Sequence, residues 1–290
     1  MNYLAKMLAV ATRCYPLLSG TGTLANSKLL SLFTPSVGNV WARVGSGSVF
    51  VPLQDWVGRS IFWFGDVDPK VTYLARHFLR KGDCALDIGA NLGVVAVRMA
   101  QMVGSSGRVH AFEPSPMAVK YLTETLSRNP ELKISLHQYA LGAVESSLRL
   151  SVPHGNSGMA SFVWQFDQGS AETVEVSVKK LDNIIENIGI KKLSFVKIDV
   201  EGFEGEVLRG AISMLRHVRP ACIVFEENQK KEGTPESIKI LLENGYRVFG
   251  ICKSWFRLKL IEFDDSKHLK EFDYMAVHED EVGSIAHLIR

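Results

Sequence analysis

The chain has 290 residues, 46% hydrophobic and 22% charged, a composition that supports a sizeable buried core and excludes a disordered polymer. Its 33 basic and 31 acidic residues give a net charge of +2 without a basic run, so nothing indicates a nucleic-acid partner. No apolar run approaches the roughly 18 residues that suggest a membrane span. The four cysteines are too scattered for a zinc site or a disulfide framework. We therefore expect a cytoplasmic protein without stable membrane insertion.

The chain begins with an irregular segment, residues 1–65, in which Gly, Ser, Thr and Pro recur. We expect it to be an N-terminal extension with short strands around 49–64. One face of a helix near the N-terminus is apolar and suits docking onto the rest of the chain: Leu4, Met7, Leu8 and Ala11. Residues 66–280 are predicted to form one domain, followed by a C-terminal tail at 281–290.

From residue 66 onward, apolar spacing predicts alternating helices and strands. The predicted helices lie within 66–83, 94–103, 116–127, 181–188, 203–215 and 235–244. The predicted strands are 84–88, 108–113, 134–140, 148–152, 173–178, 193–198, 221–225, 246–250 and 272–277. Such alternation indicates an α/β fold with a mostly parallel sheet and helices on both faces. Ligands bind outside the carboxyl ends of the strands in sheets of this kind.

The strongest local motif is ALDIGANLGVV at 85–95, in which Gly89 and Gly93 bracket a tight turn between a strand and a helix. Glycine lets the backbone turn sharply and lets a ligand approach closely. Glu113 ends the next strand, where an acid can accept both hydrogen bonds of a ribose diol. The dinucleotide fingerprint has glycines where this chain has Asn91 and Val94. Asp87 suits a cationic ligand such as S-adenosylmethionine better than a diphosphate.

Four motifs in succession resemble the signatures of the FkbM-type methyltransferases: ALDIGANLG, AFEPSP, YALG at 139–142 and FVKIDVEGFE at 195–204. The resemblance covers roughly residues 70–230, and KIDVEGFE is its most specific part. It implies a class I methyltransferase Rossmann-like sheet of about seven strands that ends in an antiparallel hairpin. It also implies S-adenosylmethionine as methyl donor and a hydroxyl on a small molecule or glycan as acceptor.

The resemblance also implies which residues hold the cofactor. The turn around its methionine part would contain Asp87, Gly89, Asn91 and Gly93. Glu113 would bind the ribose, and Ala140 and Leu141 would lie near the adenine. The family often has Asn shortly before this Ala-Leu pair, where the present chain has Gln138 and Tyr139.

Acidic residues follow the strand that ends at Ile198, although ionised carboxylates are costly to bury without partners. In a class I methyltransferase this strand end faces the departing methyl group. We expect Asp199 to act as the catalytic base, with Glu201 as a second catalytic residue. Alternatively, Asp199 or Glu201 could merely cap the helix that follows. His154, in the loop PHGNSGMASF, is another candidate base on the substrate side.

A metal site is a further alternative, which the sequence leaves open. Asp199 could share a cation with Glu227 and Asn228 from the neighbouring strand end, because a hard cation such as Mg²⁺ prefers oxygen ligands. Alternation along strand 221–226 allows only one of Glu226 and Glu227 to reach Asp199.

The sequence thus predicts an S-adenosylmethionine-dependent O-methyltransferase. Two alternatives remain, a nicotinamide-dependent oxidoreductase and a non-catalytic protein that retains a nucleoside pocket. Contacts to the acceptor are expected in the loop 153–172 and in the N-terminal extension. The sequence predicts neither the acceptor nor the oligomeric state.

Overall fold

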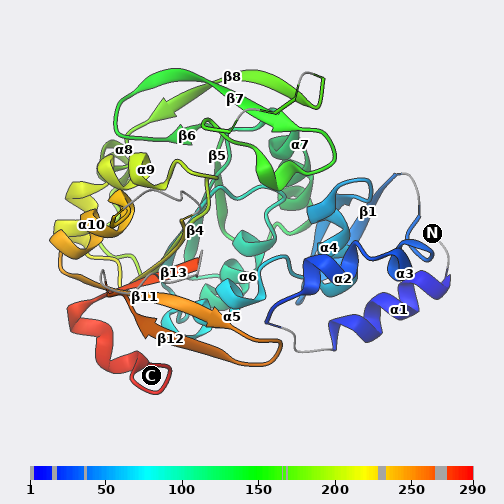
Figure 1. Ribbon diagram of the computed structural model, residues 1–290, viewed down its shortest axis with the longest axis horizontal. Helices are drawn as coiled ribbons and strands as arrows, with labels where there is room; N and C mark the ends of the chain where they lie inside the picture. The colour runs from blue at the N-terminus through cyan, green and yellow to red at the C-terminus, as the bar shows by residue number, and fades with distance from the viewer. Residues whose placement is uncertain are drawn as a thin grey trace.

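The computed structural model describes residues 3–14, 18–35, 38–164, 166–167, 169–227, 233–264 and 273–289. At its centre lies an eight-stranded sheet in the order β12-β11-β13-β10-β9-β3-β4-β5 (Figure 1). Strands from β10 to β5 pair in parallel, whereas β13, β11 and β12 pair antiparallel. This topology confirms the expected α/β sheet with an antiparallel end, and β12 adds one strand to the seven that were predicted.

The central strands are β3 (Cys84–Ile88), β4 (Arg108–Phe112), β5 (Ile134–His137), β9 (Phe195–Ile198), β10 (Cys222–Glu226), β11 (Tyr246–Lys253), β12 (Leu258–Glu262) and β13 (Asp273–His278). The smaller sheets contain β1 (Asn39–Val44) with β2 (Gly47–Pro52), and β6 (Ala140–Leu141), β7 (Ser146–Pro153) and β8 (Ala171–Lys179). The α-helices are α1 (Tyr3–Arg13), α2 (Thr21–Ala25), α3 (Lys28–Ser31), α4 (Trp56–Phe64), α5 (Pro69–Phe78), α6 (Val94–Val103), α7 (Pro116–Arg128), α8 (Leu181–Ile188), α9 (Glu204–Arg209) and α10 (Glu236–Glu243). Shorter helical segments are η1 (Ser157–Met159), η2 (Met214–Val218) and η3 (Glu279–Ile285).

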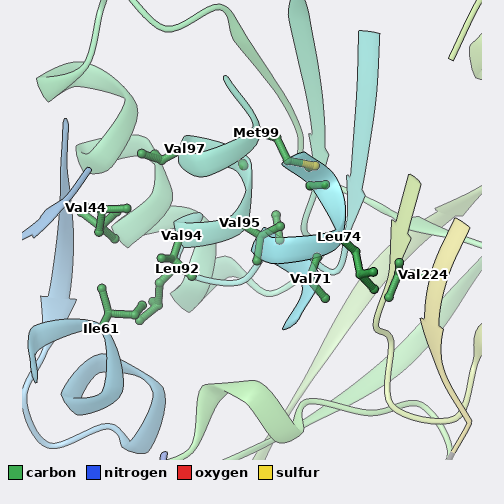
Figure 2. Packing of buried hydrophobic residues seen from close by; sticks show 14 of the residues in the cluster. Val44, Ile61, Val71, Leu74, Leu92, Val94, Val95, Val97, Met99 and Val224 are labelled. Atoms are coloured by element: carbon green, nitrogen blue, oxygen red, sulfur yellow. The ribbon is translucent and has the colours of Figure 1, made fainter. Parts of the chain in front are cut away.

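Successive residues of the central strands enter different cores, because side chains alternate across a sheet. Val224 of β10 packs in the core that contains α5 and α6, whereas Ile223 packs in the core that contains α8, α9 and α10. Figure 2 shows Val71 and Leu74 of α5 lying toward Val224. The sheet is therefore covered on both faces, as the alternating pattern predicts.

The N-terminal residues share the first of these cores. Val44 of β1 and Ile61 of α4 are fully buried in the same cluster as α6, and Figure 2 shows them beside Val94, Val97 and Leu92. Apolar packing is thus continuous across residue 65, where the sequence suggests the end of an extension.

The structure corrects two expectations for this region. Residues 56–64 form α4 rather than a strand, because Asp55 caps the helix by accepting the N–H of Gly58 at 3.0 Å. The predicted docking face of α1 holds only in part: Leu8 packs against the core, but Met7 is 57% exposed. Ala5 and Ala9 are buried, and their small side chains let α1 approach α4.

In the described residues, no helix is both long enough and apolar enough to cross a membrane. At the other end of the chain, residues 279–285 form η3, and Ile289 bridges to Leu260 of β12. Residues after β13 therefore continue to pack against the sheet.

Asn129, at the end of α7, joins the β1–β2 hairpin to the central fold. Its side chain is buried, accepts the Ser48 N–H at 3.0 Å, and donates to the carbonyls of Ser48 at 2.7 Å and Thr125 at 2.6 Å. We expect Asn129→Ala to lower the free energy of unfolding by about 1–3 kcal/mol, because it leaves buried backbone groups unpaired. Urea unfolding measures this loss, with exposed Asn187→Ala as the matched control. Equal stability of the two variants would contradict the anchoring role.

Candidate functional site

A cavity of about 420 Å³ lies at the carboxyl ends of β3, β4 and β9, a volume typical of small-molecule sites. The strand ends and β6 form one wall. The opposite wall comes from residues 18–23, the start of α4, and residues 156–160. Residues distant in sequence therefore close the site, and both regions expected to contact an acceptor reach it.

The turn after β3 runs directly against the backbone of β9. Gly89 has φ +78°, and a Cβ there would overlap the carbonyl oxygen of Asp199. Gly93 has φ +85°, and a Cβ there would overlap the side chain of Leu122 in α7. Both glycines lie where two segments of the protein pack closely together. Glycine is therefore required at these positions by packing within the protein, and not only by the close approach of a ligand.

Glu113 is buried at the end of β4 and lines the cavity. Its carboxylate accepts the backbone N–H groups of Asn91 at 2.7 Å and Ser115 at 2.8 Å. Burial raises the pKa of Glu113 to about 7, although these two hydrogen bonds favour the charged form. Each carboxylate oxygen accepts one of these bonds and has a further lone pair for a ligand hydroxyl.

Lys197 of β9 is a buried cation that lines the cavity. In the parallel register it lies opposite Asp87 of β3. Its Nζ lies 3.4 Å from both Asp87 Oδ1 and Asp199 Oδ2 and donates to the carbonyl oxygen of Gly89 at 2.5 Å. Burial acts to lower the pKa of Lys197, but the carboxylates of Asp199 and Asp87 raise it above its ordinary value. Lys197 is thus charged and ties both strand ends to the turn.

Asp87 does not lie where the sequence analysis expects it, in direct contact with the methionine part of the cofactor. Its side chain is fully buried beneath the turn and is not among the residues that line the cavity. Asp87 therefore holds Lys197 rather than facing a ligand directly. Asp199, by contrast, lines the cavity with its side chain 38% exposed.

Three carboxylates meet at the end of the cavity beyond Asp199. Asp199, Glu201 and Glu226 place one oxygen each within 4.8 Å of one another, an oxygen-rich arrangement that hard cations prefer. Burial, followed by the negative charges of Asp199 and Glu226, raises the pKa of Glu201 to about 8. Glu201 therefore holds a proton at neutral pH, which relieves the repulsion within the cluster.

The metal-ligand set expected from the sequence is not formed. Glu226, rather than Glu227, reaches Asp199, and Glu227 accepts a hydrogen bond from the Ser237 hydroxyl at 2.5 Å. Strand alternation directs neighbouring residues to opposite faces, and it is Glu226 that faces the cavity. Asn228 lies outside the described residues.

Neither Asp199 nor Glu201 caps the helix that follows, although Glu204 lies in its first turn. Helix α9 begins at Glu204 with Phe203 as N-cap and has no side-chain cap hydrogen bond. Glu204 instead accepts the N–H of Val200 at 3.1 Å and closes the turn after β9. His154 is exposed and does not line the cavity.

The predicted adenine residues, Ala140 and Leu141, are buried and line the cavity from β6. Tyr139 lines the same wall, and its hydroxyl lies 3.0 Å from His137 Nδ1. The Lys179 ammonium lies over the Tyr139 ring at 4.5 Å. Tyr139 is thus fixed from two sides as part of a flat, largely apolar surface.

Asp55 connects α4 to the loop above the cavity. Its carboxylate accepts the Gly58 N–H through one oxygen and the Ser157 N–H, at 2.6 Å, through the other. The Ser157 hydroxyl donates to Asn91 Oδ1 at 3.0 Å. Hydrogen bonds therefore connect the loop 156–160 to the N-terminal region on one side and to the glycine turn on the other.

The methyltransferase FkbM domain family matches residues 87–248, which is more than half of the chain. The chain belongs to the FkbM methyltransferase family. This confirms the resemblance carried by the four motifs, and S-adenosylmethionine is the cofactor of the family.

Three curated relatives show how far the similarity extends. Methyltransferase 1 of Beauveria bassiana is 31% identical over 43% of this chain and 57% of its own length. Hexuronic acid methyltransferase AglP of Haloferax volcanii is 29% identical over 47% of this chain and 53% of its own length. The 31-O-demethyl-FK506 methyltransferase FkbM of Streptomyces tacrolimicus is 28% identical over 66% of this chain and 83% of its own length. The chain thus aligns with little more than half of the first two.

The cavity of this FkbM family member fits the cofactor by its chemistry. Glu113 would offer a carboxylate to a diol, Ala140 and Leu141 would offer an apolar wall, and Asp199 would offer a second carboxylate to a sulfonium. Sequence reasoning missed Lys197 and Asp55, and it left open whether Glu226 or Glu227 reaches Asp199. A lysine inside the apolar strand FVKID was the available signal for Lys197, since lysine is rarely buried without a partner.

The tight contact between Gly89 and Asp199 predicts a stability effect that needs no ligand. Gly89→Ala should destabilise the fold by more than Gly189→Ala. Both glycines have positive φ, which costs alanine about 1–2 kcal/mol, but only Gly89 has backbone in the position of the Cβ; Gly189 has nothing within 4 Å. Urea unfolding of both variants isolates the packing contribution. Equal losses would contradict the contact.

Proposed function

We propose that the chain transfers a methyl group from S-adenosylmethionine to a hydroxyl on a small molecule or sugar. The observation that carries this proposal is that Glu113 and Asp199 line one cavity from the ends of β4 and β9, the two strands that flank β3. One carboxylate is placed to bind a nucleoside, and the other lies further along the same cavity to meet an acceptor.

In the proposed binding mode, Glu113 accepts hydrogen bonds from both ribose hydroxyls. Tyr139, Ala140 and Leu141 contact the adenine, and the turn at Gly89 and Asn91 surrounds the methionine part. The side chains involved are held in place by the protein itself, since Glu113 is fixed by two backbone N–H groups. Such preorganisation limits the entropy lost on binding.

Asp199 is the proposed base for the acceptor hydroxyl. The bound cofactor supplies an electrophilic methyl group on a sulfonium. Lys197 Nζ lies 3.4 Å from Asp199 Oδ2, while Glu201 retains its proton at neutral pH. Asp199, which lines the cavity, is the proposed acceptor of the hydroxyl proton, and the cavity walls orient the two reactants.

The name of one relative, a 31-O-demethyl-FK506 methyltransferase, supports an oxygen acceptor on a small molecule. Another relative is named for a hexuronic acid, which supports a sugar-derived acceptor. Neither compound is assigned to this chain. A screen of polyols, sugars and uronic acids with a methyl-labelled donor identifies the acceptor and tests the proposed reaction.

Cofactor binding should depend on pH through Glu113. Its pKa of about 7 leaves it protonated below pH 7, and only the carboxylate accepts hydrogen bonds from both ribose hydroxyls. The affinity for S-adenosylhomocysteine should therefore increase as pH rises from 6 to 8. Calorimetry measures it, and Glu113→Gln should bind more weakly at pH 8 without this dependence. A folded Glu113→Gln protein with the wild-type pH profile would contradict the ribose assignment.

Turnover assays on the acceptor from the screen separate a base from a metal. We expect Asp199→Asn to lower kcat by about 10²–10⁴-fold, the typical contribution of a positioned base, while S-adenosylhomocysteine binding persists. Glu226→Gln and Glu227→Gln form a matched pair, because only Glu226 reaches Asp199. Chelator-resistant activity that survives Glu226→Gln supports the base. Chelator-sensitive activity lost in both Asp199→Asn and Glu226→Gln, but kept in Glu227→Gln, contradicts it and identifies a metal.

A further inference from the structure

Helix α1 is apolar on two opposite sides. Ala5 and Ala9 are buried on the side that packs into the core, whereas Met7 and Val10 are 57% and 60% exposed. Ala11 and Cys14 continue the exposed stripe at helical spacing. Surface helices of globular proteins usually direct polar residues to solvent. An apolar outer stripe therefore calls for an explanation other than packing within the chain.

The exposed apolar character extends beyond α1. Helix α3 has no buried residue, and its Leu29 is 67% exposed, while Leu32 at its C-cap is 79% exposed. Leu24 of α2 is also exposed, and α2 contacts both α3 and α4. Helices α1, α2 and α3 lie together at one end of the molecule (Figure 1).

The tip of the β11–β12 hairpin lies against this region. The Leu18 N–H donates to the carbonyl of Trp255 at 2.8 Å, which joins the hairpin tip to the segment between α1 and α2. Trp255 is 62% exposed. Tryptophan is enriched where one side of a protein meets lipid headgroups.

Charge distinguishes among the surfaces that could cover these residues. Residues 1–54 contain four basic residues and no Asp or Glu. Of the basic residues near the exposed apolar side chains, Lys28 and Arg257 are exposed. A cationic apolar surface is complementary to anionic lipid headgroups, whereas a second copy of the same surface would repel it.

We propose that the face formed by Met7, Val10, Leu24, Leu29, Leu32 and Trp255, here called the docking face, binds an anionic lipid surface. Its apolar side chains would enter the headgroup boundary, and Lys28 and Arg257 would contact lipid phosphates. Residues 18–23 connect the docking face to the cavity wall, so docking would hold the cavity close to the lipid surface. The binding is peripheral and does not depend on the proposed methyl transfer.

Vesicle flotation of the full chain tests the proposal. Wild-type protein should float with vesicles of phosphatidylcholine mixed with phosphatidylglycerol, bind phosphatidylcholine alone more weakly, and dissociate as salt increases. The double variant Val10→Glu/Leu32→Glu should lose about tenfold or more in vesicle affinity. The two new carboxylates resist insertion into the headgroup boundary and are repelled by anionic headgroups. Lys28→Glu/Arg257→Glu should lose mainly the preference for anionic vesicles.

The control is Val144→Glu, since Val144 is 72% exposed in the connection between β6 and β7, two strands that lie apart from α1, α2 and α3 (Figure 1). The thermal shift with S-adenosylhomocysteine, compared with that of wild type, shows that each variant retains its fold. Failure of wild-type protein to float with anionic vesicles overturns the proposal. An equal loss in Val144→Glu also overturns it. A concentration-dependent dimer that disappears in Val10→Glu/Leu32→Glu, without vesicle binding, would show that a second copy covers this face.

Discussion

The buried ammonium of Lys197 is the interaction on which the site depends. It lies between β3 and β9, contacts Asp87 and Asp199, and holds the carbonyl of Gly89. Removing one partner from a buried ion pair leaves an uncompensated charge, a change that costs about 3–5 kcal/mol. Asp87 is fully buried, so water could not take the place of Lys197 as its partner. The position of Asp199 at the cavity and the shape of the glycine turn therefore follow from one side chain.

The remaining parts of the site are arranged around this centre by backbone contacts. Glu113 fixes the turn from the β4 side through the N–H of Asn91, and the side chain of Asn91 accepts a hydrogen bond from Ser157. Asp55 then holds the Ser157 N–H from α4. A continuous path of hydrogen bonds thus runs from the strand ends to the N-terminal region. The residues before 65 form part of the cavity wall rather than a separate attachment.

Much of the central fold could be predicted because the apolar spacing along each segment matches the helix or strand that the segment forms. The apolar spacing of 94–103 and 181–188 gave the bounds of α6 and α8 as observed, and β3 is bounded by the residues expected. Glu113 and Asp199 were found because each follows a buried strand whose carboxyl end must meet the same edge of the sheet.

The features that could not be predicted depend on tertiary contacts. The register that sets Lys197 opposite Asp87 is not visible in either strand alone. Helix α4 is rich in Trp, Val, Ile and Phe, which favour strands, and its start is fixed by the Asp55 cap. The packing of α1 through Ala5 and Ala9 could not be inferred because larger residues usually mark the buried face.

The most direct test of the central claim is a crystal structure of the protein with S-adenosylhomocysteine. We expect the ribose hydroxyls to lie within hydrogen-bond distance of the Glu113 carboxylate and the sulfur to point toward the Asp199 end of the cavity. Lys197 should keep its contacts with Asp87, Asp199 and Gly89 in that complex. A ribose bound away from Glu113, or a sulfur directed away from Asp199, would contradict the assignment of this cavity as the site of methyl transfer.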